Sequence, residues 1–342
     1  IQPILDHIEQ VFCSGDREHA EWFCKWLALP LQKRCKIGVA VILRSKDGGV
    51  GKNTIFGSTQ YGLGLMPRIY GEAFATVNDM DHLIGQFNGS AMEKWFVFGD
   101  EIGSFDGHKK DQGRLLTLIT STENSSNQKC QKVIHDLDDY RNYVFATNND
   151  RAVDMTGGGE RRFVAFNIKH HKPRSPEHTE YYNRFGPLCH NQETAKVFYR
   201  YLMSLDLEGF NAEAQAPITA YKQGLTETQR PTVEIFIKEL LSEEGISMGV
   251  SMGDDKRVTT ENDYPVVIDN SPQGSYNLSN GDLFDIYVTW CHQNNEDSRY
   301  SNKRRFLSDI KEAGGKVIQK RFGSSRSGVP LISCTNFKDC DV

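Results

Sequence analysis

The sequence predicts an α/β fold with a mainly parallel sheet, and three observations favour it. From about residue 35 to 170, apolar β-branched runs alternate with stretches of helical periodicity, which is the pattern of strand–helix–strand units. A glycine-rich segment directly follows the first apolar run, at 37–43. Two later apolar runs, 95–99 and 143–147, end in polar residues, where open α/β sheets carry their ligand sites.

The glycine-rich segment has the features of a phosphate-binding loop. It consists of Gly48, Gly49, Val50, Gly51, Lys52, Asn53 and Thr54. Backbone N–H groups, the positive end of a helix and the Lys52 ammonium together suit the phosphates of a nucleotide. In the pattern G-x-x-x-x-G-K-[ST], Lys46 takes the place of the first glycine, and Asn53 replaces the metal-binding hydroxyl. An ordinary glycine-rich left-handed turn is the alternative interpretation.

Two carboxylates and an amide follow the later strands. Asp100 and Glu101 come after the run 95–99; we expect Asp100 to hold magnesium and Glu101 to polarise an attacking water. Asn148 follows the run 143–147, and we expect it to contact the γ-phosphate or that water. A solvated acidic loop and an Asn-Asn turn are the plainer interpretations, but the phosphate loop about 50 residues earlier favours a nucleotide site.

Two adjacent arginines precede a further predicted strand, 163–168. Arg161 and Arg162 follow a run of three glycines. Surface charge is one interpretation of this pair. In a ring ATPase, one of the two would reach the γ-phosphate bound by the neighbouring subunit. The sequence does not choose between them.

Taken in order, these motifs resemble those of a superfamily 3 helicase of the AAA+ class. The resemblance is greatest to the helicase halves of phage, plasmid and large-DNA-virus primase-helicases, and it is carried by GGVGKNT, WFVFGDE, YVFATNN and GERRF. Flanking segments resemble other parts of those proteins: WFCKWLALPLQ at 22–32, Gln86-Phe87-Asn88, and LFDIYVTWCHQNN through SNKRRFLSDI.

The resemblance implies an ATP- and Mg²⁺-dependent DNA helicase. Such an enzyme translocates on single-stranded DNA, expected 3′ to 5′, and parts duplex forks as a homo-oligomeric ring, expected to be a hexamer. The resemblance assigns Lys52 to the phosphate-loop lysine, Asp100 and Glu101 to the acidic pair, Asn148 to the polar sensor, and Arg161 or Arg162 to the arginine finger. Either Asn53 or Thr54, or neither, is expected at the metal beside Asp100.

The family also places a DNA-gripping β-hairpin between the acidic pair and the sensor. Lys129 matches its lysine best, with Lys132 as a neighbour. A lysine on such a hairpin would grip the phosphate backbone without reading sequence. A solvated surface is the plainer interpretation of each lysine alone.

Patterning and resemblance together divide the chain into four parts. Residues 1–34 are predicted as a helical, collar-like segment, and 35–206 as the ATPase domain with lid helices at 175–206. A polar linker is predicted at 207–228. Residues 229–342 are predicted as a winged-helix-like domain with a long loop at 245–281, because two helices precede two strands.

Composition is compatible with this interpretation and excludes some others. The net charge is −5, unlike a general nucleic-acid coat, yet 299–330 holds nine basic and two acidic residues, a net charge of +7. None of the eight cysteines forms a C-x-x-C pair, so no zinc framework is expected. With no membrane segment evident, we expect an intracellular protein of the host cytoplasm. Because the chain begins with Ile1, we also expect a fragment of a longer enzyme that carries or works with a primase or polymerase.

Two other functions remain open at this point. One is a non-enzymatic origin- or DNA-binding module with a decayed ATPase core. The other is an AAA+ motor that acts on RNA or on protein.

Overall fold

The computed structural model describes residues 1–79, 81–85, 93–100, 109–126, 134–149, 161–228, 232–240, 280–294, 303–312, 316–322 and 325–331. The chain forms two compact units, Ile1–Gln229 and Arg230–Val342. Each unit is described by itself below.

The first unit is built on a five-stranded sheet in which every pair of neighbours is parallel. Its strand order is β4 (Phe74–Val77), β5 (Phe96–Gly99), β8 (Asn142–Thr147), β1 (Ala40–Arg44) and β9 (Phe163–Asn167). The predicted α/β fold with a parallel sheet is therefore confirmed. Strand β1 lies inside the sheet and is buried at all five positions, as expected of a parallel strand covered on both faces.

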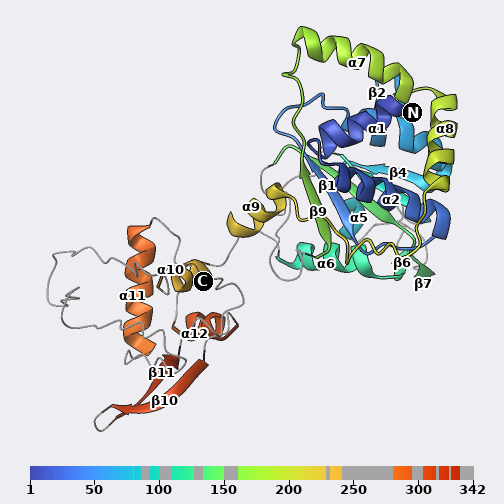
Figure 1. Ribbon diagram of the computed structural model, residues 1–342. Coiled ribbons are helices and arrows are strands. Elements are labelled where there is room, and N and C mark those ends of the chain that lie inside the picture. Colours follow the sequence, from blue (N-terminus) through green and yellow to red (C-terminus); the bar gives the residue numbers. More distant parts are fainter. Residues whose placement is uncertain are drawn as a thin grey trace. The chain divides into compact units, whose positions relative to one another are not determined.

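Helices cover both faces of this sheet (Figure 1). Val41 and Leu43 point into one core, and Ala40 and Ile42 into the other, because side chains alternate along a strand. The first core is formed with α1 (Gln2–His7), α2 (Arg17–Lys33), α3 (Lys52–Phe56), α4 (Leu65–Tyr70), α7 (Pro176–Cys189) and α8 (Gln192–Ser204). The second is formed with α5 (Asp81–Ile84), α6 (Lys109–Thr120) and α9 (Ala220–Thr228).

The N-terminal helices share the core of the sheet. The Phe96 ring on β5 lies 6.1 Å from Trp26 of α2, 6.1 Å from Phe56 of α3 and 5.0 Å from Tyr70 of α4, between ring centroids. Trp26 also donates its indole N–H to the Val39 carbonyl at 3.0 Å. Residues 1–34 are helical as predicted and pack onto the sheet; their role as a collar stays a prediction.

The segment 207–228, predicted as a linker, contains a helix in its second half and packs on the first unit. Helix α9 occupies Ala220–Thr228 and buries Leu225 against the second core. Leu207 and Ala212 are buried in the first core. The segment is polar overall, so its few apolar residues were too sparse to predict this packing.

A separate antiparallel hairpin precedes β8. Its strands are β6 (Glu123–Ser126) and β7 (Ile134–Asp138). This is where the resemblance places a hairpin. Lys129 and Lys132, predicted to grip DNA, lie outside the described residues.

Short elements complete the first unit. They are η1 (Ile8–Phe12), η2 (Gly71–Ala73), β2 (Ser58–Thr59) and β3 (Gly62–Leu63).

The second unit has its own small core. Helices α10 (Thr232–Leu240), α11 (Asn280–Gln293) and α12 (Lys303–Glu312) pack around Phe236, Tyr287, Trp290 and Phe306. Strands β10 (Lys316–Phe322) and β11 (Ser325–Leu331) form an antiparallel pair. The predicted helices and strands are present, while the winged-helix assignment stays a prediction. Of the predicted loop at 245–281, residues 245–279 lie outside the described part of the chain, and α11 begins at Asn280.

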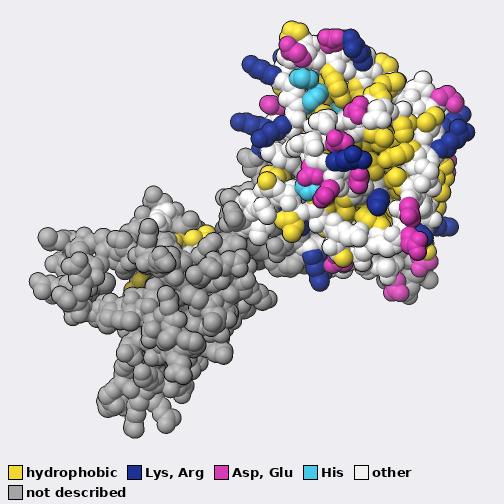
Figure 2. Space-filling model, in the orientation of Figure 1, with side chains coloured by type: hydrophobic (Ala, Val, Ile, Leu, Met, Phe, Trp, Pro, Cys, Tyr) yellow, Lys and Arg dark blue, Asp and Glu magenta, His cyan; other side chains and the backbone are white. Residues whose placement is uncertain are grey.

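Charge is mixed over the visible face of the first unit, with acidic and basic side chains interspersed (Figure 2). In the described part of the chain, no helix combines the length and the apolar character needed to cross a bilayer.

Candidate functional site

The phosphate-loop segment connects the end of β1 to the start of α3. Gly49 and Gly51 have φ angles of +78° and +81°, a region that glycine enters without steric cost. A Cβ on Gly51 would lie 2.7 Å from Nε2 of His7. The glycines at 49 and 51 are thus required by backbone conformation, and at 51 also by space.

Lys52 joins this loop to the ends of two neighbouring strands. Its ammonium donates to Ser45 Oγ at 2.8 Å, directly after β1. It also donates to the Thr147 carbonyl at 3.3 Å and to Asn148 Oδ1 at 3.2 Å, at the end of β8. Lys52 and Asn148, predicted from separate motifs, therefore lie in direct contact.

Asn53 makes the corresponding link to the acidic strand. Its Nδ2 donates to Asp100 Oδ2 at 2.7 Å. Among the described residues Asn53, and not Thr54, makes this contact with Asp100. The other amide atom, Asn53 Oδ1, is buried and has no hydrogen-bond partner among the described residues.

The donors present fit Mg²⁺, which prefers oxygen ligands and is held by one or two carboxylates. Asp100 supplies a carboxylate, and Asn53 Oδ1 is a buried acceptor beside it.

Histidine and tyrosine rings from α1 and α7 pack against the loop. His178 on α7 donates Nε2–H to the Gly49 carbonyl at 3.0 Å. His7 is buried, lies against Gly51, and bonds through Nδ1 to the Tyr181 hydroxyl at 2.8 Å. Burial, with the neighbouring His170, lowers the pKa of His7 to about 3. The His7 ring is therefore neutral at physiological pH, and the loop packs against it.

The two candidate arginine fingers lie at the other end of the sheet. The Ala40 N–H, at the start of β1, donates to the Arg162 carbonyl at 2.8 Å. Strand β1 runs from Ala40 to Arg44 before it reaches the loop, a span of roughly 13 Å. Arg161 and Arg162 are therefore not brought to Lys52 within one chain.

Among the other predicted site residues, Glu101 lies outside the described part of the chain, as do Lys129, Lys132 and the segment Gln86-Phe87-Asn88.

Sequence reasoning missed the residues that hold the loop in place. Ser45 carries a signal, because it directly follows the apolar strand that leads into the loop. His7 and His178 carry none, since they lie about 40 and 130 residues away from the loop and meet it only through the tertiary fold.

Comparisons with known proteins give a partial match to one family model and similarity in fold to solved structures. Residues 43–162 match the model of a family of unknown function, DUF5906, and this span contains Lys52, Asp100 and Asn148. No curated protein matches the chain.

Three solved structures of the C-terminal region of NrS-1 are similar in fold. Its apo structure (305–718) has a TM-score of 0.66 at 17% identity, over 96% of this chain and 75% of that chain. An A-form apo structure has a TM-score of 0.61 at 17% identity over the same shares. A second A-form structure has a TM-score of 0.54 at 20% identity, over 70% of this chain and 54% of that chain.

Replacing Gly51 with alanine should destabilise the protein by about 1–3 kcal/mol, because a side chain is strained at positive φ and meets the His7 ring. Gly48→Ala is the matched control, since a Cβ there would have no atom of the described residues within 4 Å; its effect should stay within about 0.5 kcal/mol. Chemical denaturation measures both. Equal stability of the two variants would contradict the geometry of the loop.

Acid should weaken the fold partly through His7. An unfolded histidine takes up a proton near pH 6.5, whereas folded His7 resists protonation down to about pH 3. The unfolded state therefore binds more protons, and the free energy of unfolding falls as pH decreases below about 6.5, by up to about 1.4 kcal/mol per pH unit.

His7→Asn should remove this part of the slope, whatever its stability at neutral pH. Urea denaturation of both proteins from neutral to mildly acidic pH measures the slopes. Parallel slopes for the variant and the wild type would show that His7 titrates normally in the fold.

Proposed function

We propose that this chain is an ATP-dependent DNA helicase of a viral or mobile-element replication system. Its core would hydrolyse ATP with Mg²⁺ and move along single-stranded DNA as a homo-oligomeric ring. One observation carries the proposal: Lys52 contacts Asn148, and Asn53 contacts Asp100, at the carboxyl ends of β1, β5 and β8. Ligands of open α/β sheets bind at this edge.

Each of these side chains would have a distinct task. Lys52 would be the cation that binds the β- and γ-phosphates. Its hydrogen bonds to Ser45 and Asn148 hold the ammonium beside the loop. Asp100 and Asn53 would hold Mg²⁺, which neutralises charge on the phosphate oxygens. Asn148 would orient the attacking water or report on the γ-phosphate, and Glu101 would polarise that water.

The position of the arginines supports a ring. Arg161 and Arg162 lie at the amino end of β9, away from the Lys52 of their own chain. An arginine at that distance from its own Lys52 would suit the site of an adjoining copy, where it would stabilise charge that develops during phosphoryl transfer. A hexamer and a linked primase or polymerase are further parts of this proposal.

DNA contacts are assigned to the hairpin and to the second unit. Lys129 and Lys132 lie between β6 and β7 in the sequence, and in this proposal they would follow the phosphate backbone. The basic stretch 299–330, with its net charge of +7, suits duplex or fork DNA.

Lys52→Ala should lower the kcat for ATP hydrolysis by about 10²-fold or more, because it removes the phosphate-binding charge, and should abolish strand separation. Lys94→Ala is the control, since Lys94 is only partly buried and its ammonium donates to the Glu72 carbonyl at 2.7 Å, outside the candidate site. Phosphate release and unwinding of a forked duplex measure the two activities.

Unwinding that survives in Lys52→Ala would reject this mechanism. Absence of turnover in the wild type would instead favour the non-enzymatic DNA-binding alternative. ATP turnover that is stimulated by RNA or protein, but not by single-stranded DNA, would favour an AAA+ motor that acts on RNA or on protein.

A further inference from the structure

The β6–β7 hairpin stands apart from the main sheet. The two strands pair only with each other among the described strands, and their register is irregular between Asn124 and Ser126. A lone two-stranded hairpin is marginally stable in water. The stability of the hairpin and its orientation on the first unit must therefore depend on the contacts made at its base.

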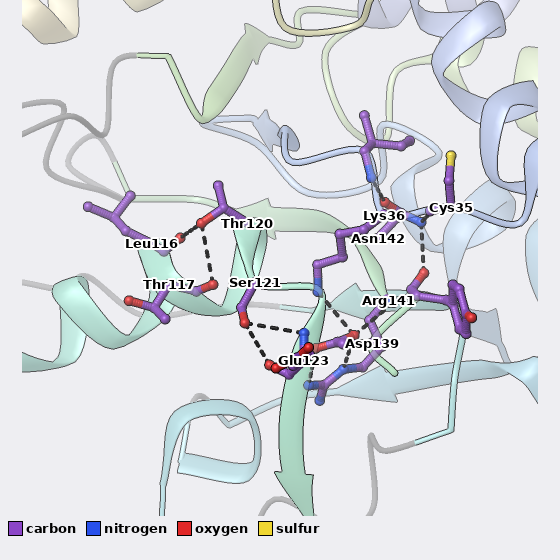
Figure 3. Close-up of polar contacts among 12 residues, drawn as sticks. Cys35, Lys36, Leu116, Thr117, Thr120, Ser121, Glu123, Asp139, Arg141 and Asn142 are labelled. Atoms are coloured by element: carbon purple, nitrogen blue, oxygen red, sulfur yellow. Dashed lines mark hydrogen bonds and ion pairs between the residues drawn. The ribbon is translucent and has the colours of Figure 1, made fainter. Parts of the chain in front are cut away.

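A buried carboxylate lies at that base. Asp139 directly follows β7, and its N–H donates to the Thr122 carbonyl, just ahead of β6, at 2.7 Å. Arg141 donates Nε–H to Asp139 Oδ1 at 2.9 Å and Nη2–H to Oδ2 at 2.6 Å. Lys36 Nζ lies 3.0 Å from Oδ1. The three side chains converge at the base of the hairpin (Figure 3) and are at most 3% exposed.

Lys36 belongs to a different part of the chain, the segment 34–37 that leads from α2 to β1. Asn142 makes a second tie to this segment: it donates to the Cys35 carbonyl at 3.0 Å and accepts from the Ile37 N–H at 2.8 Å. The Arg34 guanidinium makes a third, 5.3 Å from the centre of the Tyr140 ring. Residues 34–37 and 139–142, called the anchor junction here, are thus joined along their length.

The charged contacts in the anchor junction fix the angle between its two segments as well as the distance between them. A two-point arginine–carboxylate contact sets the angle between its partners, whereas apolar packing of similar volume would be as stable without that geometry. Burial tends to raise the pKa of Asp139, but the hydrogen bonds and charge of Arg141, with the charge of Lys36, outweigh it and lower the pKa to about 2. Burial lowers the pKa of Lys36 to about 8. Both groups are therefore charged at neutral pH.

Strand β8 connects the junction to the nucleotide site. It begins at Asn142 in the junction and ends at Thr147, whose carbonyl accepts from Lys52. We propose that Asp139, held by Lys36 and Arg141, is a positioning residue that fixes the hairpin base to the N-terminal helices and to β8, so that DNA on the hairpin and ATP at the loop influence each other. This inference rests on the proposed function, and it concerns coupling between the two activities and not hydrolysis itself.

Lys36→Met tests the inference in the full chain. It removes one arm of the junction and leaves the Asp139–Arg141 pair in place. Basal kcat and KM for ATP should stay within twofold of the wild type. The ratio of the rate with saturating thymidine homopolymer to the basal rate should fall at least fivefold. Lys36→Arg should restore this ratio to within twofold, and Lys33→Met, which changes an exposed lysine three residues earlier, should leave it unchanged.

Two results would overturn the inference while leaving the helicase proposal intact. One is an unchanged stimulation ratio in folded Lys36→Met. The other is a parallel fall of basal and stimulated rates, which indicates a structural role alone. If Lys36→Met does not fold, Arg34→Gln carries the same criteria, because Arg34 is exposed. A wild type without any stimulation by DNA would overturn the proposed function and this inference together.

Discussion

Lys52 reaches from the first residue of α3 to the ends of two neighbouring strands, and the rest of the site depends on this contact. Its partners Ser45 and Asn148 are adjacent because Arg44 of β1 pairs with Thr147 of β8. A shift of one residue in that register would turn the side chains of β8 to the opposite core. The side chains of β1 and β8 enter the two cores alternately. This alternation therefore positions the site as well as stabilising the fold, and it keeps Lys52 and Asn148 at one edge of the sheet.

Much of the sheet and the core of the site could be predicted from the sequence. The apolar runs of β1, β5 and β8 are continuous, and a parallel strand buried on both faces has that pattern. Lys52, Asp100 and Asn148 could be predicted because each lies in or next to a turn at a strand end. The link from Asn53 to Asp100 could not be chosen over Thr54, since spacing alone does not say which side chain faces the acidic strand.

Features that depend on distant contacts escaped prediction. Asp139, Lys36 and Arg141 are charged residues, and sequence alone assigns such residues to the surface; in the fold they are buried, with both cations paired to the one carboxylate. The packing of His7 and His178 against the loop likewise depends on helices far apart in the chain. Helix α9 was missed because its apolar positions are few. The residues missed in this way join one sequence motif to another. They therefore matter more for the proposed coupling between the hairpin and the loop than for predicting the fold from the sequence.

A structure with a non-hydrolysable ATP analogue, Mg²⁺ and a single strand would test the central claim most directly. In that structure we expect Lys52 to leave Asn148 for the β- and γ-phosphates and Asp100 and Asn53 to lie at the metal. We also expect Arg161 or Arg162 of an adjoining copy to reach the same triphosphate. A nucleotide bound away from the loop 48–54, with Lys52 still on Ser45 and Asn148, would contradict it.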